Sequence, residues 1–435
     1  MRFHIITLGC PRNVVDSEMM AQLLHQEGHT LVEEPEQADL LILNTCAFIE
    51  AARRETYEML EELAADKKPS QKLIVAGCLP QRYKGDVVDR FPAVDAIIGT
   101  RSWPEITSVV RALQRERRGI DYVKQKGNLV ASVRRCATMG GTAYLKIADG
   151  CNACCAFCAI PLIKGPQRSK PEDYVLREAH ELVEEGVREI ILIAQDTTTY
   201  GWDRTDVGNL PTLLRSISEQ VPQLDWLRIL YAYPQHVTEE LMYTMAELDQ
   251  VCHYLDIPLQ HGHPDVLRRM RRSPDMDGVY NLVASLREAM PDIALRSTFI
   301  VGYPGETEDE FETLLQVMRD LAFDHVGIFA FSPEEGTPAA ELPNRVPRQV
   351  MAERYERAML LQQEISVARN QEQVGRSLPI LIDGAGDGIS IGRSYRHAPE
   401  IDGLVLLSGE FPTGDFVEAK IVQAREYDLT GEPLI

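Results

Sequence analysis

The chain has 435 residues, of which 44% are hydrophobic and 26% charged, which is ordinary for a globular protein and unlike a disordered one. No run approaches the ~20 apolar residues that cross a bilayer, and the N-terminal ten residues lack the features of a signal peptide. The formal net charge of −21 counts against broad binding of RNA or DNA and fits a basic partner or simple solubility. We expect a cytoplasmic protein whose nine cysteines stay reduced and free to bind metal.

Short apolar runs alternate with helical patterns over residues 1–110, which predicts an α/β domain with a parallel sheet. Each of three runs is followed closely by a cysteine. The expected strands and their cysteines are 3–8 with Cys10, 40–43 with Cys46, and 72–76 with Cys78. The carboxyl ends of parallel strands meet at one edge of an open sheet, so these thiols should converge. We predict a three-thiolate metal site, although a single cysteine in such a place is usually a small hydrophobe.

The next segment, 111–140, holds a run of charged residues and then several glycines, and we expect a linker. Its arginines are typical of a solvated helix end, with nucleic-acid docking as the alternative. Cys136 lies in this segment without a cysteine neighbour, and we assign it no role.

From 141 to 369 a strand followed by a helix is expected to recur six times, which predicts a barrel with parallel strands inside. Six units rather than eight leave the barrel incomplete, with an open side that admits a bulky substrate. The expected strands are 143–148, 189–194, 226–231, 254–259, 294–301 and 325–331. Chemistry in such barrels gathers at the carboxyl ends of the strands.

Three cysteines follow the first of these strands in the spacing C-x-x-x-C-x-x-C, namely Cys151, Cys155 and Cys158. Three thiolates so close together hold one iron–sulfur cube and leave its fourth iron open to a small molecule. A structural zinc site needs four ligands, usually two distant Cys-x-x-Cys pairs, and we find no second pair. Cys154 permits an alternative set with Cys151 and Cys158, but we interpret it as a non-ligand.

Residues 370–435 combine short apolar runs with turns, which predicts a small antiparallel β-barrel. The expected strands are 378–382, 390–394, 403–407 and 416–423. From residue 371 onward five basic residues stand against eleven acidic ones. Such a barrel is poorly suited to phosphate and better suited to a basic protein surface.

The cysteine loop, with the aromatic Phe157 just before its last cysteine, resembles the signature of radical S-adenosylmethionine enzymes. That resemblance implies a 4Fe–4S cluster on Cys151, Cys155 and Cys158. Its open iron chelates the methionyl part of S-adenosylmethionine, and one electron then yields a 5'-deoxyadenosyl radical.

Three polar side chains of the barrel are candidates to bind that S-adenosylmethionine. Gln195 and Gln260 follow strands and carry amides suited to its amino acid or ribose. Arg296, within the fifth strand, has a guanidinium fork suited to its carboxylate. The lone His261 beside Gln260 is more often structural than catalytic.

Over essentially the whole chain, the three-cysteine domain, the radical barrel and the TRAM-like terminal barrel resemble the radical S-adenosylmethionine methylthiotransferases. This family implies a second, auxiliary 4Fe–4S cluster on Cys10, Cys46 and Cys78, whose free iron carries the sulfur to be transferred. One S-adenosylmethionine methylates that sulfur, and a second supplies the radical that removes hydrogen from the substrate. A cellular electron donor is a further implied partner. The rival interpretation is a non-enzymatic electron carrier or zinc-binding scaffold.

Two branches of this family compete. The motifs at 8–18, 44–50, 194–198, 256–262 and 426–429 look like the branch that modifies the β-carbon of an aspartate in protein twelve of the small ribosomal subunit. The tRNA-modifying branch is expected to show Gly-Cys-Gln-Met-Asn where this chain has Gly9-Cys10-Pro11-Arg12-Asn13, and a more basic terminal barrel. The resemblance thus implies the ribosomal protein or assembled subunit as partner. Methylthiolation of a modified adenosine in tRNA is the alternative, and direct tRNA binding is less favoured.

Overall fold

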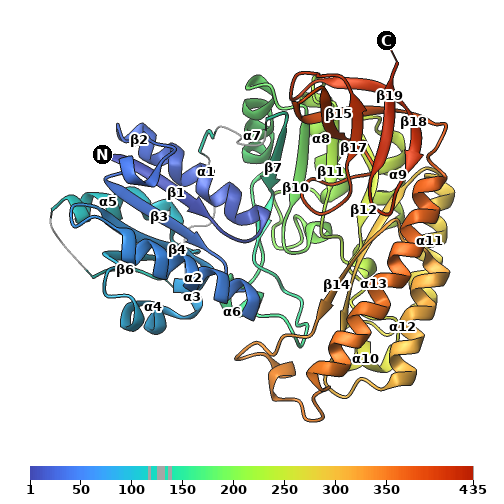
Figure 1. The fold of residues 1–435 in the computed structure, drawn as a ribbon, viewed down its shortest axis with the longest axis horizontal. Coiled ribbons are helices and arrows are strands. Elements are labelled where there is room, and N and C mark those ends of the chain that lie inside the picture. Colours follow the sequence, from blue (N-terminus) through green and yellow to red (C-terminus); the bar gives the residue numbers. More distant parts are fainter. Residues whose placement is uncertain (116–118, 125–132, 136–139, 435) are drawn as a thin grey trace.

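A computed structural model describes residues 1–115, 119–124, 133–135 and 140–434, so Cys136 lies outside the described residues. The fold consists of two six-stranded parallel sheets with helices around them and a closed five-stranded barrel (Figure 1). No helix of these residues is both long and apolar enough to span a membrane.

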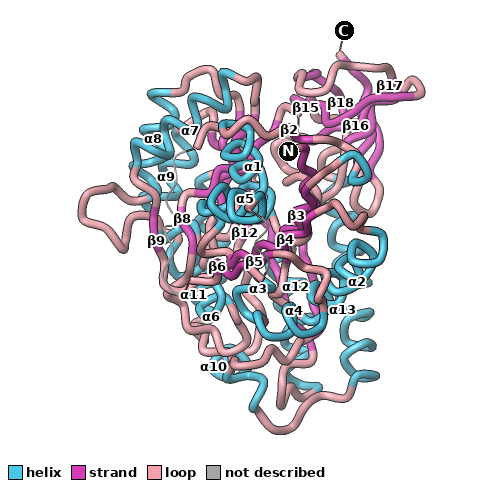
Figure 2. The backbone as a smooth tube through the Cα atoms, turned by 90° about the vertical axis from the view of Figure 1, so that its left-hand side faces the viewer, coloured by secondary structure: helices cyan, strands magenta, loops and turns pink. Residues whose placement is uncertain are grey.

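The first sheet has the strand order β2-β1-β3-β4-β5-β6, with every pair parallel. Its strands are β1 (Arg2–Thr7), β2 (Thr30–Leu31), β3 (Leu40–Thr45), β4 (Lys72–Gly77), β5 (Ala96–Gly99) and β6 (Ile120–Tyr122). The helices are α1 (Pro11–Gln26), α2 (Glu50–Asp66), α3 (Cys78–Arg82), α4 (Lys84–Arg90) and α5 (Ile106–Gln114). Figure 2 shows β3, β4, β5 and β6 of this sheet. The three predicted strands are confirmed.

Strands β2, β5 and β6 were not predicted. β6 lies within the expected linker 111–140, yet it pairs with β5, so this part of the segment belongs to the first sheet. The remaining domain limits stay predictions.

The central sheet places its strands in the order β14-β13-β12-β11-β10-β7, again all parallel. They are β7 (Thr142–Lys146), β10 (Glu189–Ile193), β11 (Trp226–Ile229), β12 (Val251–Asp256), β13 (Ala294–Val301) and β14 (His325–Ala330). β7 and β14 do not pair with each other, so the predicted partial barrel is confirmed. A short antiparallel pair, β8 (Ala148–Asp149) and β9 (Arg168–Ser169), brackets the cysteine loop.

Apolar faces of the surrounding helices cover the central strands and form the largest core cluster of the described residues. The helices of this cluster are α7 (Glu172–Glu184), α8 (Leu210–Gln220), α9 (Glu239–Glu247), α11 (Met276–Ala289), α12 (Glu308–Leu321) and α13 (Arg348–Gln371), the last through Ala358. The short helices α6 (Ile160–Ile163) and α10 (Pro264–Arg269) pack in two other clusters. The burial of these aliphatic side chains is the main stabilising force of this domain.

The terminal barrel consists of β15 (Ser377–Gly386), β16 (Ile389–Arg393), β17 (Val405–Ser408), β18 (Phe416–Ala424) and β19 (Leu429–Pro433). The prediction of an antiparallel barrel is wrong in one respect, because β17 and β19 pair in parallel. The reason is geometric. A closed ring in which every neighbouring pair is antiparallel needs an even number of strands, and this ring has five.

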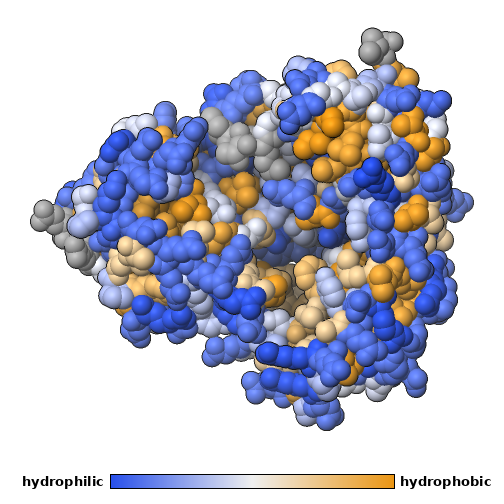
Figure 3. Space-filling model, viewed as in Figure 1, coloured by the Kyte–Doolittle hydropathy of each residue, from blue (hydrophilic) through white to orange (hydrophobic). Residues whose placement is uncertain are grey.

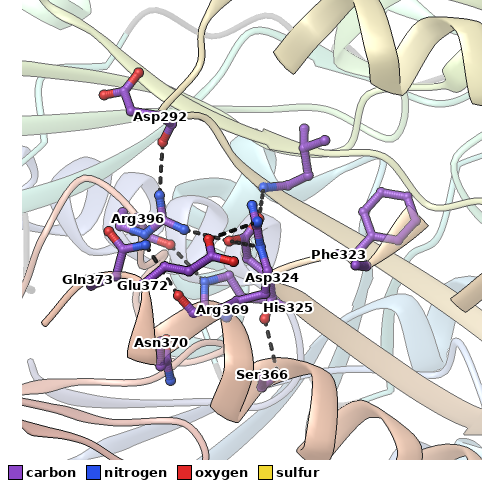
Figure 4. A network of polar contacts seen from close by, with 12 residues as sticks. Asp292, Phe323, Asp324, His325, Ser366, Arg369, Asn370, Glu372, Gln373 and Arg396 are labelled. Carbon is purple, nitrogen blue, oxygen red and sulfur yellow. Dashed lines mark hydrogen bonds and ion pairs between the residues drawn. The ribbon is translucent and has the colours of Figure 1, made fainter. Parts of the chain in front are cut away.

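The terminal barrel contacts the amino ends of the central strands, opposite the cysteine loop. Arg396 binds Asp324, which directly precedes β14, and donates a hydrogen bond to the carbonyl of Asp292, which lies just before β13 (Figure 4). Arg369 of α13 also binds Asp324, at 3.2 Å. These charges are largely buried and mutually paired, as buried charges must be, so they fix the barrel on the sheet.

Candidate metal and cofactor site

The first three cysteines lie at the carboxyl edge of three adjacent strands. Cys10 follows β1, Cys46 follows β3 and Cys78 follows β4, and the sheet order places these strands side by side. The loops are tied together by amides: Asn13 Nδ2 donates to the carbonyls of Leu8 and Thr45, at 2.8 and 3.1 Å. The structure therefore brings the predicted thiols into one group.

Two glycines make this close approach possible. Gly9 has φ of +98°, and a Cβ there would lie 2.5 Å from Cβ and 3.0 Å from Sγ of Cys46. Gly77 has φ of +100°, and a Cβ there would lie 2.5 Å from Oδ1 of Asn44. Side chains at either position would push the cysteine loops apart.

The three thiols differ in their tendency to ionise. Burial raises the pKa of Cys46 to about 11, with the nearby Cys10 charge adding to the effect. Burial also raises the pKa of Cys78. At Cys10 burial acts in the same direction, but the positive charges of Arg12 and Lys164 outweigh it and lower the pKa. The charge of Cys10 acts on both Cys46 and Cys78, as expected of neighbouring thiols.

The second group of cysteines lies in the loop between β8 and α6. Gly150, with φ of +78°, starts this loop beneath the carbonyl of Pro166, where a Cβ would come within 2.2 Å of the oxygen. Cys158 N donates to the carbonyl of Cys155 at 3.1 Å. Burial raises the pKa of Cys158 to about 12, and the charges of Cys155 and Cys151 act in the same direction. Cys151, Cys155 and Cys158 thus lie close enough for their charges to act on one another.

Cys154 differs from this group in its exposure. It is exposed, whereas Sγ of Cys155 accepts a 3.7 Å hydrogen bond from Nη1 of Arg272. Cys154 lines an open cavity of about 320 Å³, together with Asn152 and Ala153 of the same loop. The geometry thus favours Cys155 over Cys154 as the second member of the set.

That cavity has an aromatic wall which the sequence analysis did not identify. His236 lies between Trp202 and Tyr233, with ring centroids 4.8 and 4.7 Å away, and its Nδ1 is 2.8 Å from Oδ2 of Asp196. The Gln195-Asp196 pair after β10 signalled this region, but the aromatic residues come from different loops and have no common spacing.

A cluster of buried charges lies between the two cysteine groups and joins the first domain to the central sheet. Lys164 Nζ is 3.5 Å from Asp16 and 3.1 Å from Asp149, and Lys146 binds the same two carboxylates. Gln195 Nε2 donates to Oδ1 of Asp149 at 3.1 Å. Its Oε1 is buried without a hydrogen-bond partner in the described part of the chain. This free acceptor fits the amino group of a bound cofactor.

The other two predicted cofactor contacts have different surroundings. Gln260 follows β12 with φ of +75°, an uncommon conformation that is fixed by hydrogen bonds with Thr298 and Ile300. Arg296 lies within β13, but its guanidinium binds Asp256 at 3.0 Å and Asp402 at 3.4 Å. The structure thus gives Arg296 two carboxylates of the protein itself, one of them from the terminal barrel.

Both cysteine groups fit iron–sulfur clusters. Each offers three thiols from short loops, glycines keep the loops close together, and Gln195 provides an unused polar atom beside the second group. Three ligands per cluster leave one iron open. A parallel partial barrel with such a loop, an additional three-cysteine domain and a terminal β-barrel together define a radical S-adenosylmethionine methylthiotransferase.

Comparisons with known proteins agree with this class. Residues 2–99 match the model of the uncharacterized protein family UPF0004, residues 145–318 the radical SAM superfamily, and residues 374–434 the TRAM domain. The radical S-adenosylmethionine methyltransferase TsrM from Kitasatospora setae has a similar fold. It superposes with a TM-score of 0.59 at 13% identity, covering 90% of this chain and 80% of that one.

Full-length relatives identify the family. The ribosomal protein uS12 methylthiotransferase RimO of Chloroflexus aurantiacus is 49% identical over 459 residues, covering all of both chains. RimO of a Thermoanaerobacter species is 43% identical, covering 98% of this chain and 99% of its own. The chain belongs to the RimO family of radical S-adenosylmethionine methylthiotransferases.

Proposed function

We propose that this enzyme transfers a methylthio group to the β-carbon of an aspartate in ribosomal protein uS12. The observation that carries the proposal is the presence of two three-cysteine groups on the facing carboxyl edges of two sheets. The names of the full-length relatives support uS12 as the substrate. The acidic terminal barrel supports a basic protein as partner. Such a substrate places the reaction in the cytoplasm, where ribosomal subunits assemble.

We assign Cys151, Cys155 and Cys158 to the radical-generating 4Fe–4S cluster, and Cys10, Cys46 and Cys78 to an auxiliary 4Fe–4S cluster. When bound, the clusters and S-adenosylmethionine supply the radical and the sulfur that the side chains of the protein cannot provide. The buried ion pairs of Lys146 and Lys164 with Asp16 and Asp149 hold the first domain against the central one and so keep the two cysteine groups in place. The substrate C–H bond is unactivated and offers neither an acidic proton nor a leaving group. General acid–base catalysis alone therefore cannot break it, and radical chemistry is needed.

Gln195 and Gln260 are the proposed S-adenosylmethionine contacts, and the unpaired Oε1 of Gln195 supports the first of them. Contact of Arg296 with the carboxylate of S-adenosylmethionine remains a prediction. To bind the cofactor carboxylate it would have to release Asp256 or Asp402. The substrate has an entrance between the first and central domains, where the space-filling view shows a hollow (Figure 3).

The test offers two substrates to the same enzyme. The protein is reconstituted with iron and sulfide, reduced with dithionite and supplied with S-adenosylmethionine, together with purified uS12 or unmodified tRNA. We expect a methylthio mass increment on the aspartate of uS12 and none on the tRNA. An increment on the tRNA alone would overturn the proposal.

A further inference from the structure

Arg12 connects the first domain to the central sheet at the place where both cysteine groups lie. Its Nη1 donates a 2.6 Å hydrogen bond to the carbonyl of Ala194, which follows β10. Its guanidinium carbon lies 4.6 Å from the centroid of the Tyr231 ring, just after β11. Since Arg12 is in the first turn of α1, directly after Cys10, its charge lies between the carboxyl edges of the two sheets.

The backbone beneath Arg12 is held in an unusual conformation. Tyr231 has φ of +63°, which is rare for a residue with a large side chain. Its carbonyl accepts from Thr197 N at 3.0 Å, and its own N–H donates to Oδ2 of Asp256 at 3.2 Å. Such conformations persist where the surrounding structure fixes them, commonly at functional sites. The ring that supports Arg12 is therefore precisely placed by its neighbours.

Arg12 has no paired carboxylate among the described residues, a property that it shares with Arg272 among the cations near the two cysteine groups. The charges of Cys10, Tyr231 and Asp149 act on it, with Cys10 the strongest of the three. The neighbouring cations all have bound partners. Lys146 and Lys164 bind Asp16 and Asp149, Arg296 binds Asp256 and Asp402, and Arg272 donates to Cys155 and to the carbonyl of Pro258. Arg12 is partly exposed as a residue, and its hydrogen bond to the carbonyl of Ala194 involves Nη1 alone.

The proposed reaction brings an anion to this place. The carboxylate of an aspartate is bonded directly to its β-carbon, so a β-carbon that reacts between the two cysteine groups carries the carboxylate there as well. Removing a carboxylate from water is costly unless a cation binds it. A guanidinium can hold both oxygens with two parallel hydrogen bonds.

We propose that Arg12 binds the carboxylate of the substrate aspartate and thereby selects an acidic residue for modification. This inference rests on the proposed function and names the residue that recognises the substrate. A nucleobase has no carboxylate to bind.

The test measures binding to the reconstituted enzyme. Wild-type protein, Arg12→Met and Arg12→Lys are titrated with uS12 and with a uS12 variant in which asparagine replaces the target aspartate. We expect the wild type to bind the aspartate form more tightly. Arg12→Met should lose this preference and bind the aspartate form roughly 30-fold or more weakly, as when one partner of a desolvated charge pair is removed. Arg12→Lys keeps the charge without the fork and should retain part of the preference.

Iron analysis and a control variant separate substrate binding from a structural role. Arg12→Met should retain about eight iron atoms per chain, as two 4Fe–4S clusters require. Arg54→Met removes an exposed arginine of the same domain and should bind both forms of uS12 as the wild type does. Loss of about half of the iron in Arg12→Met would overturn the inference in favour of a role in holding the auxiliary cluster.

Three further results would count against the inference. An aspartate preference that survives in Arg12→Met would overturn it and leave the proposed function intact. The inference would also fail, and the proposed function would stand, if wild-type enzyme methylthiolated uS12 but bound its aspartate and asparagine forms equally. Wild-type enzyme that neither binds nor modifies uS12 would overturn both the inference and the proposed function.

Discussion

Arg393 of the terminal barrel and Glu189, the first residue of β10, form an ion pair of 2.7 Å in which both side chains are at most 1% exposed. Arg393 also binds Asp383 of its own barrel, and Glu189 binds Arg228 of β11 at 2.7 Å. The pair thus belongs to a network of ion pairs that joins the terminal barrel to the central sheet. Both charges of the pair are removed from water.

Replacing Arg393 by methionine should destabilise the protein strongly. The change leaves Glu189 buried with one cation instead of two, and breaking a buried pair from one side costs about 3–5 kcal/mol. Urea unfolding followed by tryptophan fluorescence measures the loss. Arg215→Met is the matched control, because Arg215 and Glu247 form an exposed pair whose loss costs at most about 1 kcal/mol. Equal effects of the two variants would contradict this role of the buried pair.

Gly9→Ala should prevent iron binding at the first cysteine group. The added methyl group would meet Cys46, and alanine disfavours φ of +98°. We expect loss of about half of the iron with retained cleavage of S-adenosylmethionine. Gly85→Ala in α4 is the control, because a Cβ there meets nothing within 4 Å. It should keep full iron content and gain up to about 1 kcal/mol of stability from the higher helix propensity of alanine. Unchanged iron in Gly9→Ala would contradict the assigned geometry.

Substitutions in the two cysteine groups should abolish different activities of the enzyme. Cys46→Ala is expected to spare reductive cleavage of S-adenosylmethionine and abolish methylthiolation, whereas Cys155→Ala should abolish both. Release of 5'-deoxyadenosine and product mass measure the two activities. Cys154→Ala should affect neither, since Cys154 is exposed whereas the three assigned ligands are partly buried. Methylthiolated product from Cys46→Ala would show that the auxiliary cluster is assigned to the wrong residues.

His397 should make the protein less stable in mild acid. Burial lowers the pKa of His397 well below its usual value, and the charges of His325, Arg396, Arg228 and Arg393 act in the same direction. An unfolded histidine has a pKa of about 6.5, so below that pH the unfolded chain binds more protons than the folded one. Stability therefore falls as the pH drops through about 6.5 toward the lower folded pKa.

The variant His397→Asn should flatten this dependence between about pH 7 and pH 5. Urea midpoints measured across that interval provide the comparison. His180, exposed on α7, supplies the matched variant His180→Asn, which should leave the dependence as in the wild type. An identical slope in wild type and His397→Asn would show that His397 is not responsible.

The alternation of apolar runs and helical patterns predicted both parallel sheets, because each buried strand forms a continuous apolar segment. Helix α13 was not predicted although it has 24 residues. Its buried side is mostly polar, with Arg354, Gln362, Ser366 and Asn370 at spacings of four or eight residues. An analysis based on hydrophobic periodicity cannot detect such a helix, whose buried side chains bind the rest of the protein through hydrogen bonds and ion pairs.

The cysteine groups could be predicted from the sequence because topology alone brings the carboxyl ends of parallel strands together. Arg296 shows the limit of that argument. Its position within a barrel strand could be predicted, but its partner Asp402 lies in another domain, about a hundred residues further along the chain. No local pattern encodes such a contact, since it depends on how the terminal barrel docks.

The terminal barrel lies at the amino ends of the central strands, whereas the cysteine groups lie at the carboxyl ends. Strand β13 has eight residues and is therefore roughly 26 Å long. This length separates the terminal barrel from the cysteine groups. A substrate held by the barrel must therefore extend its target residue over about that distance to reach the cysteines. A free amino acid is too small to use both regions at once. A folded partner with a long projecting loop satisfies the geometry.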